Sequence, residues 1–479
     1  MSLKQQGINA AQWSFLGTII NPLRNFIVSI FLARLLMPED FGVIGLAMVF
    51  AGMMDQLVDL GFGRAIIQKK DVTQEQLSTV FFINMIVGVF LSVVMFVTSP
   101  LVATFFKMPI LSDIVKVMSA TFVIKSLNSI QSSLFTKVLD FKKPFVIQLC
   151  SGLASGSMGI GLAYFGWGVW ALVFSQVSGW IISTIIIWLY SNWRPSWMFN
   201  FSSVKDLWQF GYKISLTITI DIIASKLDTL VIGKAFSAQL LGFYYRAQSL
   251  NRLVVQYSFK SFSDVLFPSF SKIQDNIPLL RTNVLKVIQV VSFTTFFFSG
   301  LMYVCANEII IILYGIKWLP AISFFKILGV FTFCFTLPTV LNVPIQSMGK
   351  SGKLLKLEII KKILLLLSIL IGLHFGIYGY VYAINIAALF GMMLNISMLK
   401  KLIDISVIKQ ITNIILYAFP FGVLCVLFEY QLPDINVYSL LFIKGSVYII
   451  LYILYNFLLK TEGFLFIKNL CVDAIKKHK

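Results

Sequence analysis

Long apolar runs fill most of this 479-residue sequence, and charged residues, proline or glycine separate one run from the next. A helix needs about 20 consecutive apolar residues to cross the hydrocarbon core of a bilayer. Apolar residues make up 58% of the chain and charged residues only 12%, which leaves too few polar side chains to cover a water-soluble surface. The sequence therefore predicts an all-α, polytopic membrane protein with no separate soluble domain.

The apolar runs divide into about 14 predicted transmembrane helices. Six precede a polar loop, near residues 10–37, 41–67, 79–106, 112–136, 144–165 and 168–190. Eight follow it, near residues 207–233, 240–270, 283–305, 321–347, 357–374, 376–399, 411–428 and 437–459. Twelve spans are the alternative, if two of the runs lie in the membrane interface.

The distribution of positive charge predicts the orientation. With a cytoplasmic N-terminus, the inner loops are short and basic, as at Lys142 and Lys143, whereas the outer loops are poorer in basic residues and one of them carries Glu308. Cytoplasmic loops of membrane proteins hold an excess of Lys and Arg, so we expect both termini in the cytoplasm. The same topology accounts for the net charge of +19, and we expect no nucleic-acid partner.

The two halves of the sequence resemble each other at an offset of 200 residues. Ala33 and Arg34 align with Gly233 and Lys234, and residues 41–44 align with residues 241–244. Six helices per half give two parallel, pseudo-symmetric bundles around a central cavity. We therefore expect an N-terminal six-helix lobe over residues 1–190 and a second lobe over residues 206–400. Two additional helices and a basic cytoplasmic tail would occupy residues 401–479.

Basic and amide side chains inside the predicted spans indicate a cationic lumen. Ionisable groups at bilayer depth are costly unless they face protein or water, and several basic residues share one helical face with polar neighbours. Arginine and lysine suit the oxygens of a phosphate or pyrophosphate. The predicted substrate-binding residues are Arg24, Lys125, Arg246, Arg252, Asn21 and Asn128.

Acidic residues inside the spans are candidates for a different role. A carboxylate at bilayer depth can bind a proton or a sodium ion and so couple transport to the membrane potential. The predicted ion-coupling residues are Asp55, Asp59, Asp221 and Asp228. The alternative is that such acids only form interhelical pairs, for example Asp228 with Lys226, that hold the bundles together.

The sequence contains no pattern that indicates catalysis or a cofactor. There is no Gly-rich nucleotide-binding loop, and no Ser, His and Asp set with a long loop to carry it. The five cysteines and two histidines lack metal-ligand spacing. We expect no enzyme activity, no cofactor and no metal site, which leaves transport as the predicted activity.

Six short segments carry a resemblance to a known family. They are residues 31–42, 57–63, 65–68, 226–228, 231–233 and 241–247. These segments resemble the polysaccharide exporter and oligosaccharide flippase branch of the multidrug/oligosaccharidyl-lipid/polysaccharide superfamily, with colanic-acid exporters as the nearest type. With the helix count, the resemblance covers essentially the whole chain.

The resemblance implies an inner-membrane flippase that moves a polyprenyl-pyrophosphate-linked oligosaccharide by alternating access. Such oligosaccharides are the repeat units of lipopolysaccharide, capsule and exopolysaccharide. In related flippases basic residues contact the pyrophosphate, and Arg24 is the position that matches. Membrane lipids, H⁺ or Na⁺, a polysaccharide polymerase and the chain-length machinery are the implied partners. The alternatives are a multidrug or cation antiporter of the same superfamily, a membrane polymerase or glycosyltransferase, and a scaffold that does not transport.

Overall fold

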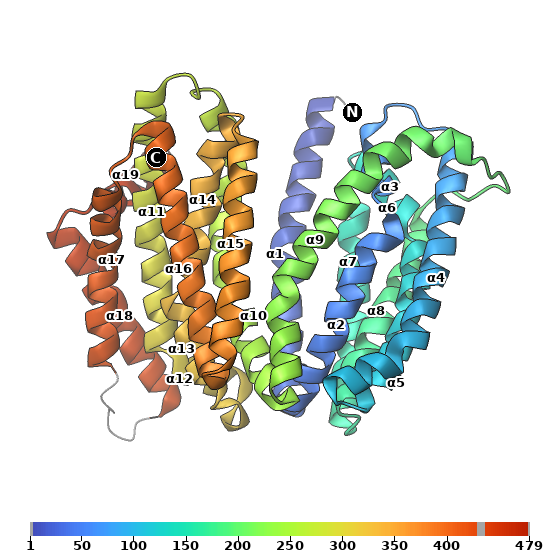
Figure 1. Ribbon diagram of the computed structural model, residues 1–479, viewed down its shortest axis with the longest axis horizontal. Coiled ribbons are helices and arrows are strands. Elements are labelled where there is room, and N and C mark those ends of the chain that lie inside the picture. The colour runs from blue at the N-terminus through green and yellow to red at the C-terminus, as the bar shows by residue number, and fades with distance from the viewer. Residues whose placement is uncertain (1–2, 429–435, 478–479) are drawn as a thin grey trace. The chain divides into compact units, whose positions relative to one another are not determined.

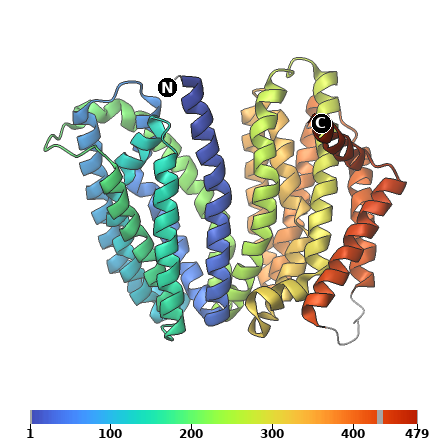
Figure 2. The same ribbon diagram turned by 180° about the vertical axis from the view of Figure 1, so that it is seen from behind.

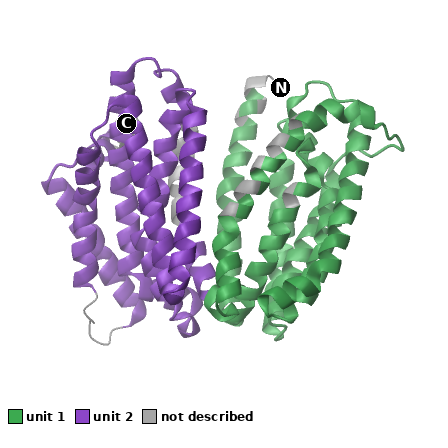
Figure 3. Cartoon of the chain, viewed as in Figure 1, with its two compact units in different colours: residues 1–242 green, residues 243–479 purple. Residues whose placement is uncertain are grey.

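The computed structural model describes the backbone of residues 3–428 and 436–477. Some side chains within those ranges lie outside the description, among them Asp55, Lys213, Asp221 and residues 254–265. Every regular element in the described ranges is helical, which confirms the predicted all-α fold. The backbone forms two compact units, Met1–Gly242 and Phe243–Lys479 (Figure 3). The predicted division at residues 190, 206 and 400 concerns the internal repeat and stays a prediction.

Figures 1 and 2 show that the helices within each unit run alongside one another as a bundle. The helices of unit 1 are α1 (Leu3–Leu35), α2 (Pro38–Asp59), α3 (Phe62–Gln68), α4 (Gln74–Phe106), α5 (Ile110–Ser126), α6 (Ser129–Lys137), α7 (Lys142–Tyr164), α8 (Val169–Tyr190) and α9 (Lys205–Ala235). The next helix, α10 (Ala238–Ser271), begins in unit 1 and continues into unit 2. Unit 2 continues with α11 (Ile277–Val304), α12 (Ala306–Tyr314), α13 (Ala321–Val330), α14 (Phe333–Ser347), α15 (Ser351–Leu373), α16 (Gly376–Ile403), α17 (Val407–Leu427), α18 (Val437–Leu458) and α19 (Glu462–Lys477).

Each predicted span corresponds to one helix or to two consecutive helices. Among the described residues, 10 helices are long and apolar enough to cross a membrane, so the multi-pass fold is confirmed but the count of fourteen is not. The other four predicted spans correspond to helices that are too short or too rich in charged residues to be counted as membrane-spanning. Helix α5 is 17 residues long, and α9, α10 and α15 carry charged side chains along their length.

Three predicted spans are interrupted, near residues 41–67, 112–136 and 321–347. Between α2 and α3 the backbone enters the left-handed region at Leu60 (φ 49°) and Gly61 (φ 80°). Glycine adopts this conformation without steric cost. A Cβ atom on Gly61 would also lie 2.6 Å from the carbonyl carbon of Gly211 on α9. Helix α3 therefore does not continue the axis of α2. The break between the two helices contacts α9.

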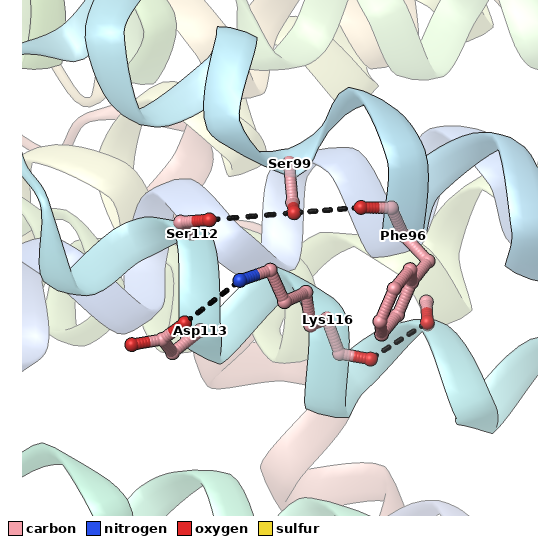
Figure 4. A network of polar contacts seen from close by, with 6 residues as sticks. Phe96, Ser99, Ser112, Asp113 and Lys116 are labelled. Atoms are coloured by element: carbon pink, nitrogen blue, oxygen red, sulfur yellow. Dashed lines mark hydrogen bonds and ion pairs between the residues drawn. The ribbon is translucent and has the colours of Figure 1, made fainter.

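Polar contacts and an apolar cluster stabilise the helices of unit 1. Figure 4 shows polar contacts of α4 and α5, in which the Ser99 hydroxyl of α4 donates to the Phe96 carbonyl at 2.7 Å and lies 3.4 Å from the Ser112 hydroxyl of α5. The nearby ion pair joins Lys116 to Asp113 at 3.0 Å. The interrupted helices are covered by an apolar cluster from α3, α4, α6 and α9 that includes Phe62, Phe81, Ile130 and Leu207.

The beginnings of α2 and α10 approach each other closely through two glycines. A Cβ atom on Gly42 would overlap the carbonyl oxygen of Ala238, and a Cβ atom on Gly242 would overlap the carbonyl oxygen of Pro38. Gly242 follows Gly42 by 200 residues, and Ala238 follows Pro38 by the same number. The two glycines and their two contact partners are thus related by the same 200-residue offset as the two halves of the sequence.

This contact predicts that Gly42→Ala and Gly242→Ala each lower stability, because the new methyl group meets backbone atoms that cannot turn away. Overpacking of this kind typically costs about 1–3 kcal/mol. The measurement is the thermal midpoint of the purified protein in detergent. Gly52→Ala is the matched control on α2, since a Cβ atom there would meet nothing within 4 Å. Unchanged midpoints in both crossing variants would contradict the close approach.

In unit 2 three tyrosine hydroxyls attach the C-terminal helices to α11. Tyr448 and Tyr452 of α18 donate to the carbonyls of Phe296 and Phe293 at 2.9 and 3.0 Å. Tyr417 of α17 donates to the side chain of Gln289 at 2.7 Å and accepts from the backbone N–H of Gly463, in the first turn of α19, at 3.0 Å. All three tyrosines are fully buried. Helices α17, α18 and α19 therefore pack on α11 through directed hydrogen bonds as well as apolar contacts.

Candidate functional site

Arg24 and Asn21 lie together on α1 where this helix packs against α7. The Arg24 guanidinium donates to the backbone carbonyl of Gln148, to Asn21 Oδ1 at 3.4 Å and to Asn25 Oδ1 at 2.8 Å. Asn21 in turn donates from Nδ2 to Gln148 Oε1 at 2.9 Å. Gly152 of α7 makes room for the guanidinium, because any Cβ atom there would overlap it.

The charge of Arg24 is not neutralised by this arrangement. Every hydrogen-bond acceptor that the described residues give Arg24 is a neutral oxygen of an amide or a backbone carbonyl. The side chain is half-buried within an apolar helix. A positive charge held by neutral dipoles in such surroundings attracts an anion more strongly than one already paired with a carboxylate. The geometry therefore suits an anionic ligand.

Lys125 and Asn128 lie together where α5 ends against α8. The Lys125 ammonium lies 4.1 Å from the ring centroid of Trp180. Asn128, between α5 and α6, donates to the Thr184 hydroxyl at 2.7 Å. Its side chain is buried, and Oδ1 has no hydrogen-bond partner. This pair thus contacts α8, whereas the pair of Asn21 and Arg24 contacts α7.

The two predicted basic residues of unit 2 differ in their surroundings. Arg246 is buried, with its guanidinium carbon 5.6 Å from the ring centroid of Tyr314 on α12. Arg252, further along α10, has an exposed side chain. In this conformation Arg246 stabilises the packing of α10 on α12, while Arg252 is accessible to a ligand.

The predicted acidic residues fall into three groups. The Asp59 carboxylate accepts from the Ser129 hydroxyl and from the backbone N–H of Gly63, whose nitrogen lies 3.0 Å from Oδ2 and 3.2 Å from Oδ1. Asp228 Oδ1 accepts from the backbone N–H of Thr229 at 2.8 Å. The side chains of Asp55 and Asp221 lie outside the described residues. Asp59 is contacted by Ser129, which is 70 residues away in the sequence.

The structure reveals one buried ion pair that the sequence analysis did not identify. Lys444 Nζ lies 2.6 Å from Glu308 Oε1, and the side chains are only 10% and 4% exposed. Glu308 was expected in an outer loop, but it lies in α12 and is buried against α18. Lys444 is a lone charge within an apolar span, and that pattern could have indicated a buried partner.

No metal centre is apparent in the described part of the chain. Groups of three or more His, Cys, Asp or Glu side chains that could hold a metal ion do not occur among the searched residues.

Comparison with known proteins shows the family of this chain. Residues 31–323 match the model of a family described as polysaccharide biosynthesis protein, a match that covers more than half of the chain. The chain belongs to this family. The lipopolysaccharide biosynthesis protein WzxC of Escherichia coli (strain K12) is 26% identical over 379 residues, which are 78% of this chain and 76% of WzxC. The teichuronic acid biosynthesis protein TuaB of Bacillus subtilis (strain 168) is 25% identical over 69% of this chain and 68% of TuaB.

The solved structure of another protein shares the fold of this chain. The lipid II flippase MurJ in an inward closed conformation superposes with a TM-score of 0.73 and covers 93% of this chain and 98% of MurJ. The two sequences are 14% identical, so the likeness establishes the fold and not the substrate. The family match confirms the predicted polysaccharide branch, and the likeness to MurJ confirms the predicted fold.

Proposed function

We propose that this chain is an inner-membrane flippase that translocates a polyprenyl-pyrophosphate-linked oligosaccharide by alternating access. The relatives WzxC and TuaB are named for polysaccharide biosynthesis, and MurJ is named as a lipid flippase. The observation that carries the proposal within the chain is the half-buried Arg24, whose charge is held by neutral oxygens. A pyrophosphate is the anion that such a lipid-linked sugar presents.

The physical problem that a flippase solves is the transfer of the charged head group. The polyprenyl tail can stay in the bilayer, but moving an ion into an apolar medium carries an idealised cost of order 20 kcal/mol. Arg24 offers a planar fork that matches phosphate oxygens, and Asn21 beside it supplies an amide. In our proposal Lys125, Asn128, Arg246 and Arg252 contact the same head group at other stages of its path.

An ion gradient is the proposed source of energy. Moving one charge across 100 mV is worth about 2.3 kcal/mol, and Asp55, Asp59, Asp221 and Asp228 are the proposed carriers of H⁺ or Na⁺. The chain then needs no cofactor and no catalytic step. We further propose that both termini face the cytoplasm and that the exported repeat units pass to a polymerase and its chain-length machinery.

Deletion of the gene in its host tests the proposed function. We expect lipid-linked repeat units to accumulate on the cytoplasmic side of the inner membrane, since their synthesis continues without transfer. Re-expression of the full chain should restore surface polysaccharide. Drug resistance and the location of the repeat units in the deletion strain separate the alternatives. If the chain were a multidrug antiporter, the deletion would change drug resistance and leave surface polysaccharide intact. A polymerase would leave single repeat units on the outer side.

A further inference from the structure

The connection between α8 and α9 exposes several large apolar side chains. Residues 191–200 form no regular secondary structure, and a short 3₁₀ turn at Phe201–Val204 completes the connection. We call residues 191–204 the α8–α9 link. A polar loop was expected here, but four of its exposed side chains are apolar, namely Trp197 (97% exposed), Met198, Phe199 and Phe201. Exposed apolar residues gathered in one segment mark a contact with a protein or with a membrane.

Hydrogen bonds fix the backbone of the α8–α9 link to the first turns of α4. Each of four polar side chains of α4 pairs with one backbone group of the link. The pairs are Gln74 with the Arg194 carbonyl and Gln76 with the Ser203 carbonyl, both at 2.8 Å, Ser78 with the Ser196 N–H at 3.0 Å, and Thr79 with the Asn200 N–H at 3.1 Å. Backbone polar groups close to lipid need partners within the protein, because hydrocarbon offers none. The link is therefore built for a place beside lipid.

Trp197 extends the lipid-facing surface of α4. Its ring stacks on Phe82 of α4, with the centroids 5.6 Å apart. Helix α4 is long and apolar enough to cross a membrane, and beyond Phe82 it exposes apolar side chains at three- or four-residue intervals along the same helical face. These side chains are Ile86, Phe90, Val93, Val97 and Leu101, which are 55–68% exposed. Trp197 thus lies at the end of the stripe that α4 presents to the acyl chains.

The place and charge of the α8–α9 link fit the surface of a bilayer. Figures 1 and 2 show the link projecting from the edge of unit 1, at the end of the bundle where α1 begins. Tryptophan gathers at the level of the lipid headgroups, since its ring is apolar and its N–H is polar. The link carries Arg194 and no acidic residue, so it does not repel anionic headgroups. Continuity with the stripe of α4 favours lipid over a protein partner.

We propose that the α8–α9 link is a membrane-surface anchor, with the side chains of Trp197, Phe199 and Phe201 inserted between lipid headgroups and acyl chains. Its partner is the lipid surface itself. Because the link is hydrogen-bonded to α4 and leads directly into α9, its insertion holds the beginnings of both helices at the membrane surface. The proposed orientation of the chain places the anchor in the inner leaflet, but the insertion depends neither on that orientation nor on flipping.

Depth-dependent quenching of tryptophan fluorescence tests this proposal in purified full-length protein in lipid nanodiscs. The emission lost in Trp197→Phe isolates the signal of Trp197. Phosphatidylcholine brominated near the headgroup end of its acyl chains should reduce this signal by at least about twofold, as expected for a ring at headgroup level. Lipid brominated near the terminal methyl groups should quench it less, and acrylamide in the water should quench it little.

Trp318→Phe is the matched control, because Trp318 is fully buried and its signal should respond neither to brominated lipid nor to acrylamide. Phe199→Trp is a second probe that should respond as Trp197 does, so the test does not depend on one variant. Strong acrylamide quenching without lipid quenching would place the link in water and overturn the proposal in favour of a protein partner.

Stronger quenching by the deep bromines than by the shallow ones would place the rings in the hydrocarbon core and would also overturn the anchor. These measurements need no lipid-linked substrate. Failure of the flippase proposal would therefore be seen separately, as an inserted link in a protein that does not flip.

Discussion

Arg24→Ala is expected to lower the export of lipid-linked repeat units by at least about tenfold. A hydrogen bond to a charged group contributes about 1.5–3 kcal/mol, and each 1.4 kcal/mol corresponds to about a factor of ten. The Arg24 guanidinium lies beside Asn21 on α1 and is half-buried. The hydrogen-bond acceptors that the described residues give it are all neutral oxygens. The measurement is flipping of a fluorescent polyprenyl-pyrophosphate oligosaccharide in proteoliposomes, with surface polysaccharide in the complemented deletion strain as a second readout.

Arg24→Lys is the matched variant for this prediction, because it keeps the positive charge and removes the planar fork. We expect it to retain an intermediate rate, since lysine binds phosphate as a point charge. Lys116→Ala removes a charge from an ion pair on α5 that has no place in the proposed path and should export normally. Wild-type flipping by Arg24→Ala, at equal amounts of folded protein, would remove Arg24 from the substrate path.

Breaking the buried ion pair of unit 2 should produce the largest loss of stability. Glu308→Ala or Lys444→Met leaves one charge buried without its partner, at an expected cost of about 3–5 kcal/mol. Both side chains are almost fully buried, and the Oε1 to Nζ distance is 2.6 Å. The measurement is the thermal midpoint in nanodiscs, together with the yield of monodisperse protein.

The double variant Glu308→Leu with Lys444→Met is the control for this prediction. Replacing both partners of a buried pair by apolar residues is often neutral or stabilising, so we expect the midpoint to recover most of the loss. Single variants as stable as the wild type would show that water reaches the pair and that it contributes little. A double variant no better than the single ones would show that packing around α12 and α18, and not charge, sets the stability.

The positions of the long helices were predictable from the sequence, but the breaks between α2 and α3, α5 and α6, and α13 and α14 were not. The apolar run near residues 41–67 continues across Leu60 and Gly61 without a change of period, so it indicates a single helix. The left-handed backbone at Gly61 becomes understandable only with Gly211, which is 150 residues away and contacts it from α9. Helices α12 and α19 were missed because they are short or amphipathic and flank stronger apolar runs.

The candidate site was predictable to a similar extent. The helical period placed Asn21 and Arg24 on one face of the first span, and the structure shows them in contact. Their partner Gln148 could not be found in this way, since no local pattern links α1 to α7. The same holds for Asp59, whose partners Asn84 and Ser129 come from two other helices. Periodicity identifies the face of a helix, but only tertiary packing identifies its neighbour.

The tyrosine contacts of unit 2 limit which parts of this protein can move independently. The hydroxyls of Tyr448 and Tyr452 on α18 donate hydrogen bonds to two backbone carbonyls of α11. The Tyr417 hydroxyl on α17 donates to a side chain of α11 and accepts from a backbone N–H of α19, so it links both helices to α11. Separating these helices would expose buried hydroxyls and carbonyls to the lipid, where nothing replaces their partners. A spin label or fluorophore on the exposed side of α18 should therefore report the displacement of α11 itself.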